Sequence, residues 1–235
     1  MTYGDLIMSK YKILLFDADA TLLDFHRSEY EAVIDCLEFA GLPTTDEIIK
    51  KYSEINDGYW KMLERNEITK PALMVARWRS LLDYYGFDFD AEIISKLYPE
   101  KLSEKCYLLD GAEEICKKLY GKFKMYIITN GFKSVQQKRF CASPLAKYFD
   151  DVFISEDIGY DKPSPKYFEI ISKRIPNYDP QNALVIGDSL TSDIRGGINA
   201  GIDTCWFNPN GKKAPEDMKI TYTISNLSQI EGIVL

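Results

Sequence analysis

The chain has 235 residues, of which 46% are hydrophobic and 28% are charged, and its formal net charge at pH 7 is -7. This composition is that of an ordinary globular protein, and the length is enough for one large domain or a domain that carries an insertion. Because nucleic-acid binding depends on neutralising phosphates with Lys and Arg, the negative charge argues against a nucleic-acid polymer as partner. Small phosphorylated ligands are compatible with this negative net charge, since a cation at the binding site can outweigh the electrostatic field of the whole molecule.

No segment of the sequence predicts membrane insertion or export. The longest uncharged apolar runs have only a few residues, whereas a transmembrane helix needs roughly 20. The first twelve residues lack the pattern of a secretory signal. Five scattered cysteines without CxxC spacing are typical of a reducing compartment, where they act as small core residues. We therefore expect a soluble, cytoplasmic monomer or homodimer with no membrane partner.

The chain begins with a strand pattern and then changes to a helical one. Residues 12–17 form a short, nearly continuous apolar run, as expected for a central parallel strand that is covered on both faces. The stretch 27–105 has apolar residues at helical spacing and no convincing strand. Its helical segments are 28–42, 46–64, 70–86 and 90–104. The sequence therefore predicts an insertion of four helices after the first strand.

Beyond the insertion, strand and helix patterns alternate to the end of the chain. After a helix near 110–121, the predicted strands are 124–129, 151–155, 183–187, 203–207 and 221–225, with helices near 135–140, 165–174 and 191–200. Such alternation implies right-handed crossovers and a mostly parallel sheet. The predicted fold is α/β: a Rossmann-like, three-layer parallel-sheet core formed by 1–24 and 106–235, with an α-helical domain, 25–105, inserted into it.

Polar side chains gather at one edge of this predicted sheet, where open parallel sheets bind their ligands. They are Asp17, Asp19, Thr129, Asn130, Lys162, Asp188 and Asp193. Any one of them alone could be a turn former or a helix cap. Together, the carboxylates would repel one another unless a cation lay between them. Mg²⁺ suits such a site, because it accepts few protein carboxylates and keeps positions for water and phosphate.

Four motifs in the sequence resemble those of the haloacid dehalogenase superfamily, whose members are mostly Mg²⁺-dependent phosphatases. They are "DADAT", "ITNG", "DKPSPKYF" and "GDSLTSDIRGG", in this order and spacing. An insertion directly after the first motif is similar to the subfamily with a helical cap. The stretches "DADATLLDF", "INDGYWKMLERNEIT" and "TNGFKSVQQKRF" resemble the YjjG-like pyrimidine 5'-nucleotidases. The resemblance therefore implies a hydrolase with a HAD-like core and a cap domain.

This resemblance implies a role for each polar residue at the edge. Asp17 would be the nucleophile that forms an aspartyl-phosphate, and Asp19 would be the general acid and then the general base. The phosphoryl group would be bound by Thr129, Asn130 and Lys162. Mg²⁺ would be held by Asp17, the main-chain carbonyl of Asp19, and Asp188, with Asp193 in support. The implied substrate is a small phosphorylated metabolite, with a pyrimidine nucleoside monophosphate as the first choice.

Other activities on the same scaffold remain open at this point. The motifs do not distinguish a nucleotidase from a phosphatase of sugar phosphates or phosphoglycolate, and a phosphomutase or a non-catalytic protein is a further alternative. A 2-haloacid dehalogenase is disfavoured by Asp19, because cleavage of a carbon–halogen bond needs no proton for the leaving group. Ala20 replaces the glycine of many relatives; we expect no effect, although a positive φ there would be strained.

The sequence leaves the contacts to the rest of the substrate undecided. In the insertion, the candidates are Tyr59, Trp60, Arg77, Trp78 and Arg79. Aromatic residues at helical spacing more often form the core of a helix bundle than a binding site. His26, the single histidine, could reach the ligand or be a solvated or core residue.

The predicted helix after Thr129 is rich in polar residues. They are Lys133, Gln136, Gln137, Lys138 and Arg139. The first turn of this helix would lie beside a bound phosphate, where its free N–H groups are useful. Residues further along the helix are expected at the surface.

Overall fold

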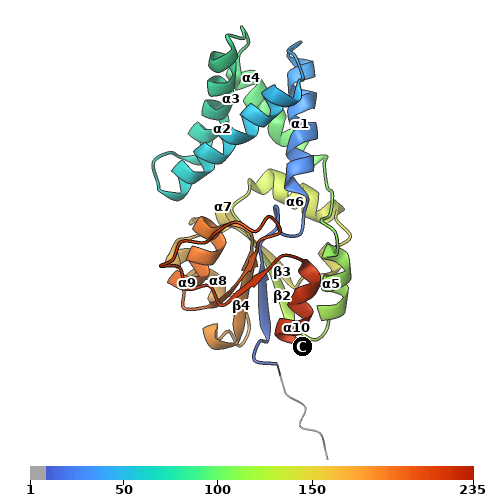
Figure 1. Ribbon diagram of the computed structural model, residues 1–235, viewed down its shortest axis with the longest axis vertical. Coiled ribbons are helices and arrows are strands. Elements are labelled where there is room, and N and C mark those ends of the chain that lie inside the picture. Colours follow the sequence, from blue (N-terminus) through green and yellow to red (C-terminus); the bar gives the residue numbers. More distant parts are fainter. Residues whose placement is uncertain (1–8) are drawn as a thin grey trace, which may run out of the picture.

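The computed structural model describes residues 9–235, a parallel sheet with helices on both faces and four further helices beyond its carboxyl edge (Figure 1). Residues 1–8, on which much of the prediction about a secretory signal depends, lie outside the described residues. Within 9–235, no helix combines the length and the apolar character that are needed to cross a membrane.

The sheet has six parallel strands in the order β3-β2-β1-β4-β5-β6. The strands are β1 (Ile13–Phe16), β2 (Lys124–Thr129), β3 (Asp151–Ile154), β4 (Ala183–Gly187), β5 (Asp203–Phe207) and β6 (Tyr222–Ile224). The first strand lies in the middle, with Phe16 in register with Ile127 on one side and with Ile186 on the other. The loops after β1, β2 and β4 therefore leave the sheet side by side.

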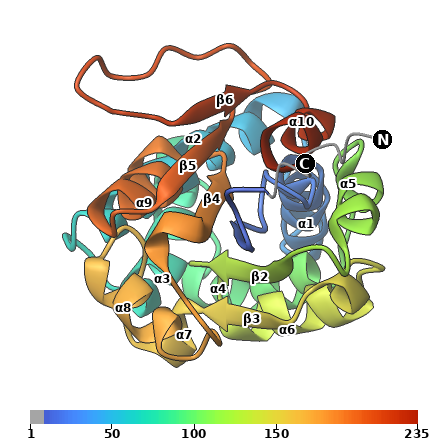
Figure 2. The same cartoon turned by 90° about the horizontal axis from the view of Figure 1, so that it is seen from below.

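Helices cover both faces of this sheet, which makes the three layers that the alternating pattern predicts (Figure 2). Leu14 and Phe16 pack into one core with α5 (Ala112–Leu119) and α10 (Ile230–Val234), while Ile13 and Leu15 face the other core with α8 (Pro165–Ser172). The helices α7 (Ser155–Ile158) and α9 (Arg195–Asn199) lie on the same side as α8. Because both faces of β1 are buried, its sequence is apolar without alternation.

The insertion consists of the four predicted helices, which stand beyond the carboxyl edge of the sheet (Figure 1). They are α1 (Phe25–Phe39), α2 (Asp46–Glu64), α3 (Lys70–Tyr85) and α4 (Ala91–Ser103). Asp24, Thr45 and Asp90 each cap the following helix with a side-chain oxygen. The helices share a hydrophobic core of their own, which Phe132 and Val135 from the sheet side complete. The limits 25–105 predicted for a separate domain remain a prediction.

Two segments connect the insertion to the sheet, and they run alongside each other. The amide of Asp24 donates to the carbonyl of Tyr107 at 2.9 Å, and the amide of Leu109 donates to the carbonyl of Leu22, also at 2.9 Å. Leu23 and Leu108 form an antiparallel bridge between these bonds. The chain therefore enters and leaves the insertion at one paired junction.

The remaining elements differ in detail from the sequence pattern. The helix predicted at 135–140 is longer, α6 (Lys133–Ala142), and the one predicted at 191–200 is a π-helical turn, Leu190–Ile194, followed by α9. Short 3-10 turns occupy Ala146–Tyr148, Pro180–Asn182 and Leu227–Gln229. All five cysteines are free, and three are buried as expected, whereas Cys106 is half-buried and Cys141 is exposed.

Candidate active site

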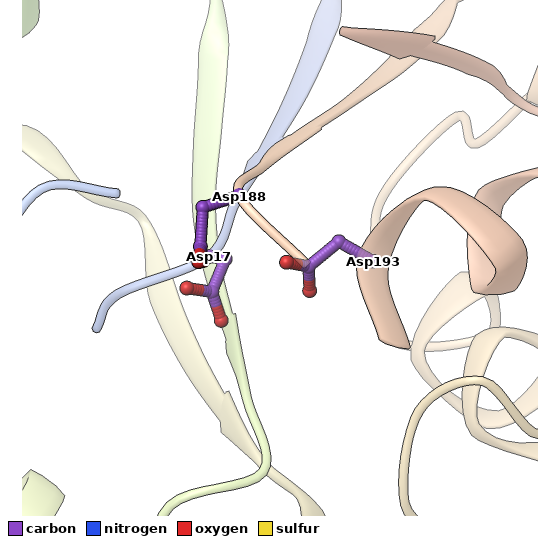
Figure 3. A group of neighbouring side chains, drawn as sticks. All are labelled: Asp17, Asp188 and Asp193. Atoms are coloured by element: carbon purple, nitrogen blue, oxygen red, sulfur yellow. The ribbon is translucent and has the colours of Figure 1, made fainter. Parts of the chain in front are cut away.

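Three carboxylates meet at the carboxyl edge of the sheet (Figure 3). Asp17 follows β1, Asp188 follows β4, and Asp193 lies in the π-helical turn after it. Each offers one oxygen, and these oxygens lie within 4.8 Å of one another. Gly187 makes room for the arrangement, because a Cβ at this position would lie 2.3 Å from Oδ2 of Asp193. The structure therefore brings together three of the four acids that the sequence selected.

The ammonium group of Lys162 pairs with two of these acids. Its Nζ donates to Oδ1 of Asp17 at 2.7 Å, to Oδ1 of Asp193 at 2.6 Å and to the carbonyl of Ile128 at 2.7 Å. The residue is 1% exposed, and these three bonds engage all three of its protons. Oδ2 of Asp17 accepts no hydrogen bond from residues 9–235. One carboxylate oxygen is thus neutralised while the other is free to react.

The charges at this edge do not balance within the described protein. Three carboxylates and one ammonium leave two negative charges uncompensated when all are ionised. Burial, reinforced by repulsion from Asp193, raises the pKa of Asp17 above its ordinary range and the pKa of Asp188 to about 7. Burial alone would lower the pKa of Lys162, but Asp17 and Asp193 raise it instead. A divalent cation with oxygen ligands matches both the charge and the donor atoms, so the site fits Mg²⁺.

Thr129, at the end of β2, has a hydroxyl that is prepared to donate. Its Oγ1 accepts from the amide of Gly131 at 3.0 Å and from Nε2 of Gln136 at 2.9 Å. Because the oxygen already accepts two hydrogen bonds, its own proton is available to a ligand. The side chain is 2% exposed and belongs to the same edge as the acids.

Asn130 braces the loop that carries the lysine. Its Nδ2 donates to the carbonyl of Lys162 and its Oδ1 accepts from the amide of Lys162, both at 2.8 Å. Nδ2 also lies 3.3 Å from Oγ of Ser192. The side chain therefore fixes the main chain of Lys162, and the phosphate contact inferred for it stays a prediction.

Asp19 is held by two residues of α6. Oδ1 accepts from Nη1 of Arg139 and Oδ2 from Nε2 of Gln136, each at 2.5 Å. Arg139 is 0% exposed and Gln136 is 2% exposed. The expectation that the later residues of this helix lie at the surface is therefore wrong for these two, although Gln137 and Lys138 are exposed. Their polar side chains point inward because a carboxylate and a hydroxyl lie there to receive them.

Ala20 adopts the left-handed conformation, with φ of 61°. Its amide donates to the carbonyl of Leu23 at 2.9 Å, and the amides of Leu22 and Leu23 donate to the carbonyl of Ala18, so the turn after Asp19 is tightly closed. A residue with a Cβ is strained in this region. The positive φ considered for this position is therefore present.

The aromatic and cationic candidates of the insertion differ in how far they are buried. Arg77 and Trp78 are buried in the bundle at 1% and 0% exposure, as the core interpretation predicts, whereas Arg79 is exposed. Trp60 is half-buried, and its ring centroid lies 5.7 Å from that of Phe132, which follows the Thr129 loop. Tyr59 is half-buried too and shares a 2.8 Å hydrogen bond with Ser80. Arg77 also lies over the ring of Phe132, at 5.8 Å, but it is buried, so Trp60 is the partly exposed candidate beside this loop.

Two residues that the sequence did not single out, Lys70 and Glu64, also make contacts at this edge. Lys70, at the start of α3, pairs with Asp161 at 2.7 Å and donates to Oγ of Ser155 at 2.6 Å. Burial raises the pKa of Glu64, while its hydrogen bond to Thr191 works the other way. His26 is exposed and lines a cavity of about 350 Å³ that adjoins Asp188. The end of α2 thus contacts the turn that carries Asp193, and the start of α3 contacts the loop before Lys162.

The fold and its acidic edge define an α/β enzyme core with an inserted helical bundle, and comparison with known families gives the class. The sequence model of the haloacid dehalogenase-like hydrolase family matches residues 11–201 of this chain. The chain therefore belongs to the haloacid dehalogenase-like hydrolase family. The resemblance read from the four motifs is confirmed, and so is the predicted fold class.

Several relatives resemble the chain along nearly all of its length. HAD-hydrolase YfnB of Bacillus subtilis is 38% identical over 97% of both chains. Pyrimidine 5'-nucleotidase PynA of Streptococcus pneumoniae is 36% identical over 91% of both, and pyrimidine 5'-nucleotidase YjjG of Escherichia coli is 32% identical over 96% of this chain and 98% of its own. The chain is thus a hydrolase related to pyrimidine 5'-nucleotidases.

One solved structure matches the arrangement of both parts. The crystal structure of YfnB bound to magnesium superposes with a TM-score of 0.92 at 38% identity, covering 95% of this chain and 98% of that chain. That structure is described as revealing interdomain movement.

Proposed function

We propose that this hydrolase is a Mg²⁺-dependent phosphomonoesterase that works through an aspartyl-phosphate on Asp17 and acts on pyrimidine nucleoside monophosphates. The observation that carries the proposal is the environment of Asp17. One of its oxygens is bound by Lys162 while the other accepts no hydrogen bond from the described residues, at an edge where Asp188 and Asp193 leave negative charge to be balanced.

Asp17 would attack the phosphorus of the ester with its free oxygen. The bond from phosphorus to the ester oxygen breaks as the new bond forms, and Asp19 gives its proton to the departing oxygen. Lys162 balances the charge on Asp17, and the hydroxyl of Thr129 donates to a phosphoryl oxygen. Phosphoryl transfer relies on such positioning and charge stabilisation, and each of these groups is a charge or a donor.

The second half of the reaction would release Asp17. Asp19, now a carboxylate, takes a proton from a water molecule as the water oxygen attacks phosphorus. The bond between phosphorus and the oxygen of Asp17 breaks, which restores the Asp17 carboxylate and releases inorganic phosphate. Both steps need the same two carboxylates and no histidine.

Asp17, Asp188 and the main-chain carbonyl of Asp19 would hold Mg²⁺, with Asp193 fixing Lys162 beside them. The bound ion would supply positive charge to the phosphoryl oxygens and to the nucleophile, so that two anions can approach each other. The raised pKa of Asp17 and of Asp188, which has burial as its main cause, supports a site that needs a cation to be stable.

Residues 25–105 would form a cap domain that excludes water during the transfer. The contacts of Lys70 with Asp161, the residue before Lys162, and with Ser155 support a cap that reaches the loop carrying Lys162. Trp60 beside Phe132 is the residue we assign to the pyrimidine ring. The two relatives named pyrimidine 5'-nucleotidases support this choice of substrate over sugar phosphates.

The test is a hydrolysis screen with and without Mg²⁺, using UMP, dUMP and dTMP beside glucose 6-phosphate and phosphoglycolate. We expect release of phosphate from the nucleotides to exceed release from the other esters at least about tenfold, and to stop when the metal is chelated. Asp17→Asn keeps the size of the side chain but removes the nucleophile, so it should lower turnover by at least about 10³-fold.

A matched variant, Asp88→Asn, changes an exposed acid between α3 and α4 and should keep full activity. Unchanged activity in Asp17→Asn would overturn the nucleophile assignment, and faster hydrolysis of sugar phosphates would overturn the substrate. Crystals of the protein grown with Mg²⁺ and beryllium fluoride should carry a trifluoroberyllate on Oδ2 of Asp17.

A further inference from the structure

We infer that Arg139 and Gln136 of α6 are positioning residues for the proton transfers of Asp19, an inference that rests on the proposed function. Neither residue belongs to the four motifs. Together they engage both carboxylate oxygens of the residue that would protonate the leaving group. A general acid acts only when its proton lies within hydrogen-bond reach of the departing oxygen. Residues that set the orientation of the Asp19 carboxyl group therefore affect the rate of the first step.

Gln136 ties Asp19 to the group that would bind the phosphoryl oxygens. Its Nε2 donates both to Oδ2 of Asp19 at 2.5 Å and to Oγ1 of Thr129 at 2.9 Å. One amide nitrogen therefore spans the proton donor and the phosphate-binding hydroxyl, and it fixes the distance between them.

The main chain is shaped to admit this amide. A Cβ on Gly131 would lie 2.3 Å from Nε2 of Gln136 and 2.8 Å from its Cδ, so no other residue at 131 leaves the side chain in place. Gly131 has no positive φ, and its turn therefore does not by itself require glycine. The close approach of Gln136 is the reason that the structure gives for a glycine there.

Arg139 ties Asp19 to both connections of the helical insertion. Its Nε donates to the carbonyl of Lys105 at 3.0 Å, Nη2 lies 3.4 Å from Oγ of Ser28, and Nη1 donates to Oδ1 of Asp19 at 2.5 Å. Ser28 is in the first turn of α1 and Lys105 follows α4. The position of the carboxylate is thus set from the same junction about which the insertion would move.

The arrangement leaves Asp19 able to react. Each carboxylate oxygen has a second lone pair, and the side chain remains 25% exposed while that of Arg139 is 0% exposed. The two donors therefore hold the carboxyl group from the buried side, and its other face is turned to the accessible part of the site.

The test compares two esters that differ in their need for a proton. The alkoxide leaving group of UMP needs protonation, whereas 4-nitrophenyl phosphate releases a stabilised phenolate without it. The measured quantity is kcat/KM, which reports the steps up to formation of the aspartyl-phosphate and is independent of its later hydrolysis. Asp19→Ala, measured first, gives the selective loss that follows when the acid is absent.

Arg139→Met and Gln136→Met replace each donor by an apolar side chain of similar length. We expect each to lower kcat/KM for UMP at least about tenfold while that for 4-nitrophenyl phosphate falls less than about threefold, since a general acid contributes roughly 10²–10⁴-fold. Arg139→Lys keeps one charged donor and should recover part of the loss. The matched controls are Lys138→Met and Gln137→Met, which change exposed neighbours on the same helix and should leave both values unchanged.

An equal fall with both esters in the Met variants would overturn the inference, because a purely structural role affects both reactions alike. Unchanged or faster UMP hydrolysis would overturn it too. Should Arg139→Met fail to fold, as judged by circular dichroism, Gln136→Met decides alone. If the wild type hydrolyses neither ester, the proposed function fails; if Asp19→Ala is selective and the Met variants are not, only the positioning role fails.

Discussion

Ala20 has an unfavourable backbone at the centre of the loop that follows β1. Its φ of 61° lies in the left-handed region, which costs an alanine about 1–2 kcal/mol. The turn that holds Asp19 between Ala18 and Leu23 requires this conformation, as its hydrogen bonds close around it. Strain of this kind persists only where the surrounding structure determines the backbone.

Ala20→Gly should therefore stabilise the protein. Glycine removes the strain but adds about 0.5–1 kcal/mol of entropy to the unfolded chain, so we expect a net gain of about 0.5 kcal/mol. For a chain of this size the gain corresponds to a rise in Tm of about 1–2 °C, measured by calorimetry. The control is Ala40→Gly, at a φ of -80°, which should lower Tm instead. A lower Tm in Ala20→Gly would show that its Cβ makes contacts worth more than the strain.

The sequence predicted the site residues that follow strands, and Asp193 as well, whereas it placed Gln136 and Arg139 at the surface of their helix. Asp17, Thr129 and Asp188 could be assigned to one edge because parallel strands bring their carboxyl ends together. Arg139 and Gln136 could not, since polar residues in a helix usually face water and their partner lies 120 and 117 positions away. A signal was present nonetheless: both share the helix face of Phe132 and Val135, which are buried.

At the scale of elements, the helical insertion buries a polar network between its helices. Glu29 of α1 is 3% exposed and accepts from Ser53 at 2.5 Å and from Asn56 at 2.8 Å. Asn56 in turn accepts from Nη1 of Arg77 at 3.0 Å. Burial raises the pKa of Glu29 to about 7, although its hydrogen bonds to Ser53 and Asn56 oppose the shift.

This shift makes the stability of the protein depend on pH. The folded state favours the protonated carboxyl of Glu29, so its contribution is complete below a pH of about 4.5 and is lost as the pH rises through about 7. The difference amounts to about 2.5 kcal/mol between pH 5 and pH 8. Glu29→Gln, which is always neutral, should match the wild type at pH 5 and be more stable at pH 8, measured by urea unfolding at both values.

The control for this prediction is Glu38→Gln, an exposed glutamate on the same helix, which should follow the wild type at both pH values. A Glu29→Gln protein that is less stable than the wild type at pH 8 would mean that the charged carboxylate is needed in the network, as the counter-charge of Arg77.

The boundaries of an element could be predicted from the sequence where the apolar pattern repeats over several turns. All four helices of the insertion were predicted to within a few residues, because each shows several turns of a buried face and three have capping side chains. The short helices α7 and α10, of four and five residues, carry too few turns to give a period. The π-helical turn at Leu190–Ile194 depends on side-chain bonds of Ser189 and Asp193, which no period reveals.

At the scale of the whole molecule, Mg²⁺ should stabilise the fold. A cation that binds the folded state alone adds about 2.7 kcal/mol at a concentration 100 times its Kd. For 235 residues this is a rise in Tm of about 5–10 °C, measured by differential scanning calorimetry with and without the metal. Asp188→Asn should lose most of the rise, whereas Asp88→Asn, in an exposed loop, should keep it. An identical rise in both variants would place the ion elsewhere.

The paired connection between sheet and insertion has a consequence for how such enzymes diversify. Because Leu23 and Leu108 pair with each other in a bridge, the polypeptide leaves the sheet and returns to it at a single place. A different helical bundle could be inserted between Leu23 and Leu108 without any change to the residues at the carboxyl edge of the sheet. If the insertion holds the substrate as proposed, a change of bundle would change substrate preference and leave the residues of the sheet edge as they are.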